Sequence, residues 1–118
     1  MAELIREENT IVLRMSTLEK LEGVHGDIRV AVSTVQSVTV LDDVIHAVHG
    51  VKMPGSRIPG VFAMGTFVSN NEGTSFAMVH HQHKRGLKIT LKGAPYDALI
   101  VGVDDPEKVV RSLGLTVE

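Results

Sequence analysis

The sequence contains no cysteine and very few aromatic residues. Without cysteine, the chain can form no disulfide bond, no thiol-based active site and no cysteine zinc site. It has no Trp, one Tyr and three Phe in 118 residues, so its core must consist mainly of Val, Leu, Ile and Met. Proteins bind single-stranded nucleic acid by stacking bases on aromatic rings. The scarcity of such rings argues against nucleic acid as a partner.

A charge excess and long apolar runs are lacking as well. The formal net charge of −2 provides no general attraction to nucleic acid or to an anionic membrane surface. No window approaches the roughly 18 apolar residues of a membrane-spanning helix. The N-terminus, MAELIREENT, carries three acidic residues and one basic residue, and it has neither the basic start nor the apolar run of a secretory signal. We expect a cytoplasmic protein that does not insert into membranes.

Apolar and polar residues alternate with a period of two along most of the chain. The length fits one domain, which we expect to span residues 1–118, with 1–9 as a flexible N-terminus. The alternation predicts about seven strands. Their approximate positions are 11–15, 28–32, 38–40, 61–68, 76–80, 87–91 and 99–103. A break in parity predicts a bend or bulge near residues 34–37.

Two segments have the pattern of short helices. In LDDVIHAVHG, residues 41–50, Asp42 or Asp43 is a plausible N-cap and Gly50 a plausible stop. This pattern predicts a short helix over residues 42–49.

The second helical segment is DDPEKVVRSLG, residues 104–114. An Asp cap is followed by proline at the first helical position, and Gly114 ends the segment. Val109, Val110 and Leu113 form one apolar stripe. A helix this short is not stable alone, so we expect the stripe to pack on a sheet.

Residues 50–65, GVKMPGSRIPGVFAMG, hold the densest group of turn residues in the chain. Pro54-Gly55 and Pro59-Gly60 predict a loop of prescribed shape that leads into the strand over 61–68. That strand is apolar in both alternating registers, so we expect it to be covered on both faces. The glycines do not form a phosphate-binding loop, because a strand follows them and no Gly-Lys-Ser/Thr sequence is present.

Four stretches resemble the bacterial pleckstrin-homology-like (PH-like) domain family, in particular small actinobacterial proteins of unassigned function. They are LDDVIHAVHGVKMPGSRIPGVFAMGT (41–66), SFAMVHHQHKRGLKITLKG (75–93), APYDALIVGV (94–103) and DDPEKVVRSLGL (104–115). The resemblance implies a mostly β fold. Its expected form is a seven-stranded bent antiparallel sheet or barrel capped by a C-terminal α-helix, with a short extra helix near residues 42–49.

The resemblance implies little about the ligand, because PH-like folds serve lipid-binding, peptide-binding and assembling domains alike. Relatives that bind phosphoinositides carry basic residues on the first two strands and on the loop between them. Here that loop, residues 17–28, has three acidic residues and one lysine. Arg14 and Arg29 on the flanking strands do not make a cluster. We therefore expect no phosphoinositide binding.

Histidine is the one residue type that is noticeably frequent, with six copies. His46 and His49 share a helix face, and His81 and His83 share a strand face. Such imidazoles are common ligands of zinc and nickel. No recognised ligand motif is present, however, and no carboxylate stands among residues 80–83. We predict no metal and no cofactor, and these four histidines are the candidate ligands if a metal binds.

Basic residues form a further candidate surface for a ligand or partner. His80, Lys84 and Arg85 lie near the end of a predicted hairpin. Together with the neighbouring histidines they make an anion patch that gains charge below about pH 6.5. Lys52 and Arg57 from the Pro/Gly-rich segment extend this patch.

A catalytic group of residues is not evident in the sequence. The two Asp-Asp doublets occupy positions where helix caps belong, and no serine has the context of a nucleophile elbow. We predict a non-enzymatic domain that binds a protein partner or assembles with itself as a homo-oligomer. The alternative is a small-ligand or metal-binding module at the histidine-rich hairpin end, formed by His80, His81 and His83.

Overall fold

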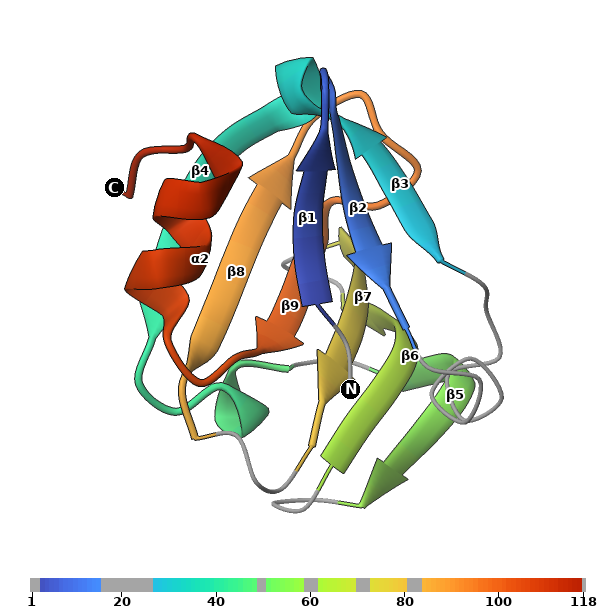
Figure 1. Ribbon diagram of the computed structural model, residues 1–118. Helices are drawn as coiled ribbons and strands as arrows, with labels where there is room; N and C mark the ends of the chain where they lie inside the picture. The colour runs from blue at the N-terminus through green and yellow to red at the C-terminus, as the bar shows by residue number, and fades with distance from the viewer. Residues whose placement is uncertain are drawn as a thin grey trace.

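The computed structural model describes residues 3–15, 27–48, 51–58, 62–69, 73–80 and 84–117, with 51–58 and 62 described by their backbone alone. The described strands are β1 (Glu3–Glu7), β2 (Thr10–Arg14), β3 (Ile28–Ala31), β4 (Val35–Leu41), β5 (Val51–Ile58), β6 (Phe62–Ser69), β7 (Gly73–Val79), β8 (Gly86–Leu91) and β9 (Ala98–Gly102). The described helical elements are the 3₁₀ turns η1 (Val32–Thr34) and η2 (Ile45–Ala47) and the α-helix α2 (Pro106–Leu113). The protein is mostly β with a C-terminal helix, as predicted (Figure 1).

The first sheet is antiparallel and has the order β1-β2-β3. β3 shows the predicted alternation clearly, because Ile28 and Val30 are buried while Arg29 and Ala31 are exposed. The chain then turns through η1 into β4 of the second sheet. This turn and a register shift at the start of β4 confirm the predicted bend near residues 34–37.

β1 lies within residues 1–9, for which the sequence predicted no regular structure. Only Leu4 of this strand is buried, so the strand has little hydrophobic pattern. It forms because it pairs with β2 along its whole length, in a hairpin that turns at Glu8 and Asn9. Such tight turns need positive φ and usually contain glycine. Here Glu8 adopts a φ of 55°, and the turn therefore gave no signal in the sequence.

The second sheet has six strands in the order β4-β8-β9-β7-β6-β5. β9 lies between β8 and β7 and runs parallel to β7, while the other neighbours are antiparallel. All five residues of β9 are buried, which is typical of a central strand. The sequence predicted seven antiparallel strands in a sheet that closes on itself. The described residues instead form nine strands in two sheets, neither of which closes.

The Pro/Gly-rich segment forms a strand, and the prediction of a loop over Pro54-Gly55 was wrong. Residues 51–58 form β5, which pairs with β6 at one end of the six-stranded sheet. The register shifts between Lys52 and Gly55. A terminal strand tolerates proline because one of its sides needs no partner, and an irregular register absorbs the misfit. Residues 59–60 lie outside the described residues.

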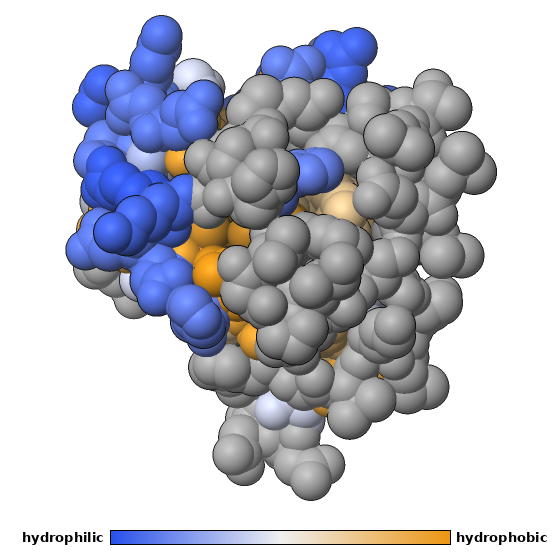
Figure 2. Space-filling view, turned by 90° about the horizontal axis from the view of Figure 1, so that it is seen from below, coloured by the Kyte–Doolittle hydropathy of each residue, from blue (hydrophilic) through white to orange (hydrophobic). Residues whose placement is uncertain are grey.

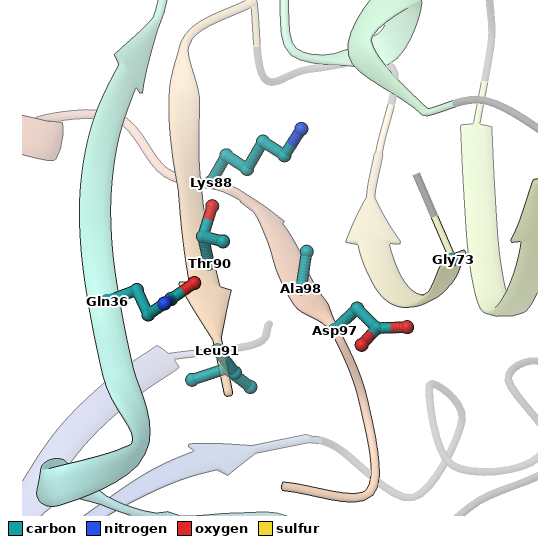
Figure 3. A pocket seen from close by; sticks show the side chains of 7 residues that line it. All are labelled: Gln36, Gly73, Lys88, Thr90, Leu91, Asp97 and Ala98. Atoms are coloured by element: carbon teal, nitrogen blue, oxygen red, sulfur yellow. The ribbon is translucent and has the colours of Figure 1, made fainter. Parts of the chain in front are cut away.

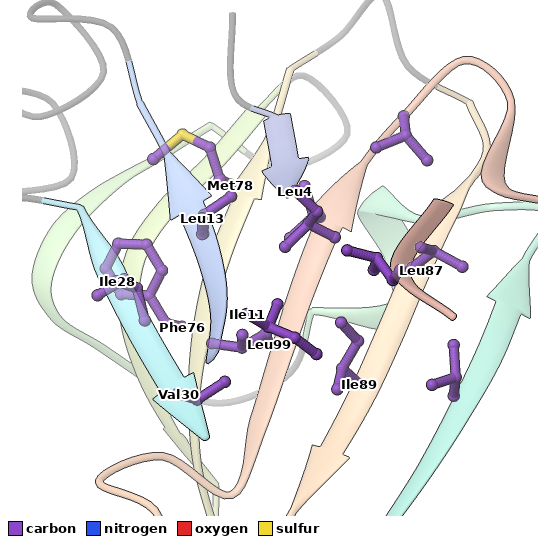
Figure 4. Packing of buried hydrophobic residues seen from close by; sticks show 14 of the residues in the cluster. Leu4, Ile11, Leu13, Ile28, Val30, Phe76, Met78, Leu87, Ile89 and Leu99 are labelled. Carbon is purple, nitrogen blue, oxygen red and sulfur yellow. The ribbon is translucent and has the colours of Figure 1, made fainter. Parts of the chain in front are cut away.

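The larger hydrophobic cluster fills the space between the two sheets (Figure 4). Side chains from β1, β2 and β3 meet side chains from β4, β6, β7, β8 and β9, and Val110 and Leu113 of α2 complete the cluster. The core is mostly Val, Leu, Ile and Met, as the composition predicted, with Phe76 as its largest fully buried member.

A smaller hydrophobic cluster lies on the opposite face of the six-stranded sheet. There Val44 and Val48 pack with Ala63 and Phe67 of β6. Met64 of the same strand belongs to the larger cluster. β6 therefore buries side chains on both faces, as predicted, although Val68 in the same register as Met64 is exposed.

The short helix predicted over residues 42–49 is reduced to η2, which has no side-chain cap. Its expected caps have other partners. Asp42 accepts a hydrogen bond from Arg85, and Asp43 lies 2.7 Å from the ring of His46. Because the caps are diverted, the described part of this segment forms a single 3₁₀ turn.

α2 is the helix that the sequence predicted near the C-terminus. The side chain of Asp105 accepts a hydrogen bond from the backbone N of Lys108 at 3.2 Å, and Gly114 ends the helix with a φ of 68°. α2 packs against both β1 and β4, and Arg6 donates to the carbonyl oxygen of Leu113 at 2.9 Å. The helix thus lies where the terminal strands of the two sheets approach each other (Figure 1).

Candidate functional site

The two sheets have four terminal strands, β1, β3, β4 and β5. A terminal strand carries backbone N–H and C=O groups on one side that its own sheet does not use. β1 and β4 have α2 packed against them. β5 contains Pro54, which has no N–H, and its register with β6 is interrupted. β3 pairs with β2 in an unbroken register. Among the described terminal strands it therefore combines a regular backbone with an edge against which α2 is not packed.

The outward side of β3 can be assigned from its hydrogen bonds. The backbone N of Val32 donates to the carbonyl oxygen of Asn9 at 2.8 Å, which continues the pairing of β2 and β3. Backbone groups alternate along an antiparallel strand, so even-numbered residues of β3 face β2, whereas Arg29 and Ala31 face away. The Ala31 carbonyl accepts a hydrogen bond from Thr34 Oγ1 at 2.6 Å. Among the described residues, the backbone groups of Arg29 have no partner on this side.

A groove of about 160 Å³ lies beside this outward side of β3. Residues 27–30 line one wall, and Pro95 and Tyr96 line the other. The Tyr96 ring packs against Phe76 in an edge-to-face arrangement, with ring centroids 5.6 Å apart and an interplanar angle of 63°. This contact fixes the position of the wall, because Phe76 is itself fully buried in the core.

Arg29 and Asp27 are the charged residues at this end of the sheet. The Arg29 guanidinium reaches across β2, where its Nη1 lies 2.8 Å from Oε1 of Glu7 on β1, and both side chains are more than half exposed. Asp27 Oδ1 accepts a hydrogen bond from the backbone N of Met15 at 3.0 Å, which holds the start of β3 beside the end of β2. An exposed ion pair contributes about 0–1 kcal/mol. A guanidinium group also has more N–H donors than one carboxylate can use, so Arg29 can bind a second carboxylate.

A second hollow, of about 460 Å³, lies on the face of the six-stranded sheet that faces away from the main core (Figure 3). Its polar lining residues come from β4, β8 and the start of β9, and they are Gln36, Lys88, Thr90 and Asp97. Figure 3 shows the charged ends of Lys88 and Asp97 pointing in different directions. A small-ligand site usually has a few polar groups that converge on one ligand. The hollow is therefore the weaker of the two candidate sites.

Arg85 joins three parts of the fold through ion pairs. Its Nη1 and Nη2 lie 2.9 Å and 3.1 Å from the two carboxylate oxygens of Glu107 in α2, and its Nε lies 3.3 Å from Asp42 Oδ1. The hydrogen bond with Glu107, with a smaller contribution from Asp42, raises the pKa of Arg85 above its ordinary value. Seen from below, polar residues gather on the side where α2 lies (Figure 2). The cluster holds α2 against the start of β8.

The residues predicted to contact a ligand or partner fall in three places. Lys52 and Arg57 lie on β5, opposite Phe67 and Ala63 of β6. His80 follows β7 and is half-buried, Lys84 is exposed just before β8, and Arg85 is engaged by the two carboxylates. Where the structure describes the side chains of these five residues, they do not converge on one pocket.

Of the four candidate metal ligands, only His46 lies among the described residues, and its Nδ1 is 2.7 Å from Asp43 Oδ2. His49, His81 and His83 lie outside them. In the part of the chain that the structure describes, no group of three or more His, Asp or Glu side chains is placed to hold a metal ion.

Sequence reasoning did not select the groove residues as a site. Tyr96 is the only tyrosine of the chain, and its ring packs against Phe76. Arg29 was one of several exposed strand positions. Arg29 matters because β3 is the terminal strand of its sheet. The position of β3 in the sheet depends on pairing between segments that are distant in the sequence, and the alternation within one strand does not reveal it.

Comparison of the chain with protein-family models, with curated proteins and with solved structures gave no match. Within the described ranges, no helix has both the length and the apolar character needed to cross a membrane. The edge of β3 and the groove beside it are therefore the features of the described residues that bear on function.

Proposed function

We propose that this chain is a non-enzymatic binding domain that holds a protein partner in the groove between β3 and residues 95–96. The observation that carries the proposal is the position of the groove, directly beside the outward backbone groups of Arg29. A peptide segment can use both features, because it brings backbone donors and acceptors together with side chains.

We also propose that the domain is PH-like. The four similar sequence stretches support this, as does a C-terminal helix that packs against a terminal strand of each sheet. The parallel pairing of β7 and β9 is a departure from the expected antiparallel arrangement. A cytoplasmic location, and the expectation that nucleic acid and phosphoinositides are not bound, stay predictions of the sequence.

The alternative function, binding of a small ligand or a metal by His80, His81 and His83, also stays a prediction. His80 is half-buried, and the other two histidines lie outside the described residues. Calorimetric titration with zinc and with nickel at neutral pH tests this alternative. The absence of any binding heat would remove it.

The main proposal is tested by selecting binders from a phage-displayed random peptide library and titrating them into ¹⁵N-labelled protein. We expect the largest chemical-shift changes at the amides of Ile28–Ala31 and Tyr96, which border the groove. Lys88→Ala, in the second hollow, is the matched control and should leave the affinity unchanged. Failure to select any binder, or shifts confined to residues around Lys88 and Thr90, would overturn the proposal.

A further inference from the structure

We infer that the partner enters as an extended strand added to β3, with an acidic side chain opposite Arg29 and apolar side chains on either side of it. This inference rests on the proposed function and specifies the chemistry of the partner. It follows from three properties of the β3 edge, namely its backbone groups, the direction of its side chains and its charge.

The backbone of β3 offers three groups to an added strand. Arg29 provides an N–H and a C=O, and Ala31 provides an N–H, because these residues face away from β2. The Ala31 carbonyl is already engaged by Thr34 Oγ1, and the chain then turns away through η1. Pairing is therefore centred on Arg29 and ends at Ala31. A short segment is enough to use it.

The side chains of β3 determine which residues the added strand needs. Ile28 and Val30 are buried on the side of the core, and Arg29 and Ala31 point to the exposed face. In paired strands, directly opposite residues share a face. The partner residue opposite Arg29 is thus on the exposed face, and the residues before and after it point toward the inner face. There the apolar wall of Ile28, Val30 and Tyr96 favours aliphatic side chains.

Charge selects the residue opposite Arg29. Opposite charges stabilise a cross-strand pair, and like charges directly opposite each other are destabilising. To meet a carboxylate there, the Arg29 guanidinium must turn away from Glu7 on β1. That ion pair is exposed and contributes only about 0–1 kcal/mol, so the turn costs little. A second copy of this chain that paired β3 with β3 about a two-fold axis at Arg29 would place arginine against arginine. The edge therefore fits a different protein better than a second copy.

The direct test uses capped peptides of the form Ser-Thr-Val-X-Val-Thr-Ser, with X as Glu, Gln or Lys, titrated into labelled protein. Wild-type protein should bind them in the order Glu, Gln, Lys, with steps of about twofold to fivefold. Arg29→Glu should reverse the order. Arg29→Ala keeps the backbone N–H, so it should still bind all three peptides but should not distinguish them by charge.

Arg29→Pro isolates the backbone contribution. Proline removes the outward N–H without breaking a bond to β2, so the protein should fold and lose affinity by about tenfold or more relative to Arg29→Ala. N-methylation of residue X provides the same test without any change in the protein, because it removes the donor opposite Arg29. Sedimentation of the free protein should show a monomer.

The outcomes separate the two proposals. If library-selected peptides shift the groove amides with an affinity that neither Arg29→Pro nor N-methylation of the peptide changes, the proposed function would stand and strand addition would be overturned. If the designed peptides do not bind while library-selected peptides do, the proposed alternation of acidic and apolar side chains in the partner would be overturned. A dimer that is lost in Arg29→Pro would overturn the choice of a different protein as partner.

Discussion

β3 and β5 each end a sheet, yet their backbones are arranged differently. β3 has four residues, pairs with β2 without interruption and contains no proline. β5 has eight residues, contains Pro54 and loses register with β6 between Lys52 and Gly55. Proline and irregular pairing are common devices that prevent strands from adding to a sheet edge. The shorter strand is therefore the better docking edge of the two.

The segment that is richest in turn residues is therefore not the candidate binding edge. Proline and an irregular register constrain the backbone of the Pro/Gly-rich segment, and these constraints hinder the addition of another strand to β5. The candidate binding edge has an ordinary strand sequence, IRVA. Its capacity to bind follows from its place at the end of a sheet and from the groove beside it.

The largest expected effect comes from moving proline by one residue within β3. Val30→Pro removes an N–H that faces β2 and should lower the free energy of unfolding by about 3 kcal/mol or more. Arg29→Pro changes an outward N–H and should cost less than about 1 kcal/mol. Urea denaturation measures both. Equal losses in the two variants would contradict the assigned direction of the β3 backbone.

Substitution of Tyr96 in the groove wall should cause the next largest loss of stability. Tyr96→Ala removes the edge-to-face contact with Phe76 and should lower the free energy of unfolding by about 1–3 kcal/mol. It should also weaken binding of the valine-containing peptides, because one apolar wall of the groove is lost. Tyr96→Phe keeps the ring and serves as the control. Thermal denaturation and peptide titration of the two variants provide the comparison, and identical behaviour would exclude a role for the ring.

The protected edge can be tested by removing its protection. Pro54→Val restores an N–H and a β-branched residue within β5. We expect this variant to associate with itself as its concentration rises, which sedimentation velocity would detect, while wild-type protein stays monomeric. An unchanged sedimentation coefficient would show that the proline is not what protects β5.

The smallest effect is expected at Arg85, where the ion pairs are exposed. Arg85→Ala should leave peptide affinity unchanged and lower stability slightly, and about 1 M salt should remove the difference from wild type. The raised pKa of Arg85 implies stabilisation that is fully present below the ordinary pKa of arginine and is lost only as pH rises through the higher pKa of the folded state. The difference in stability should therefore be constant between about pH 6 and 9. Denaturation at several pH values and salt concentrations measures it.

The sequence predicted those elements whose cause is local. Alternation located most strands, and an Asp cap with Gly114 bounded α2 correctly. β6 buries Met64 on one face and Ala63 and Phe67 on the other, as expected, whereas Val68 is exposed. β1 and β5 were missed because their strands exist through pairing, with weak patterns of their own. The segment after Asp42 formed less helix than predicted, because Arg85 and His46 compete for its caps.

The candidate site was harder to predict than the elements. The order of strands in a sheet determines which backbone N–H and C=O groups have no partner within it. That order depends on contacts between residues that are far apart in the chain. Asn9 and Val32 assign the direction of β3, and Pro95 and Tyr96 form the opposite wall of the groove. No local spacing links these four residues. The histidines, which do stand out in the sequence, remain untested as ligands.

The most direct test of the central claim is amide hydrogen exchange at Arg29 and Val30, measured with and without the Glu-containing peptide. Val30 should be protected in both states, because its N–H faces β2. Arg29 should exchange rapidly in the free protein and become protected on binding. Protection of Arg29 in the free protein, or its continued rapid exchange in the complex, would contradict strand addition at β3.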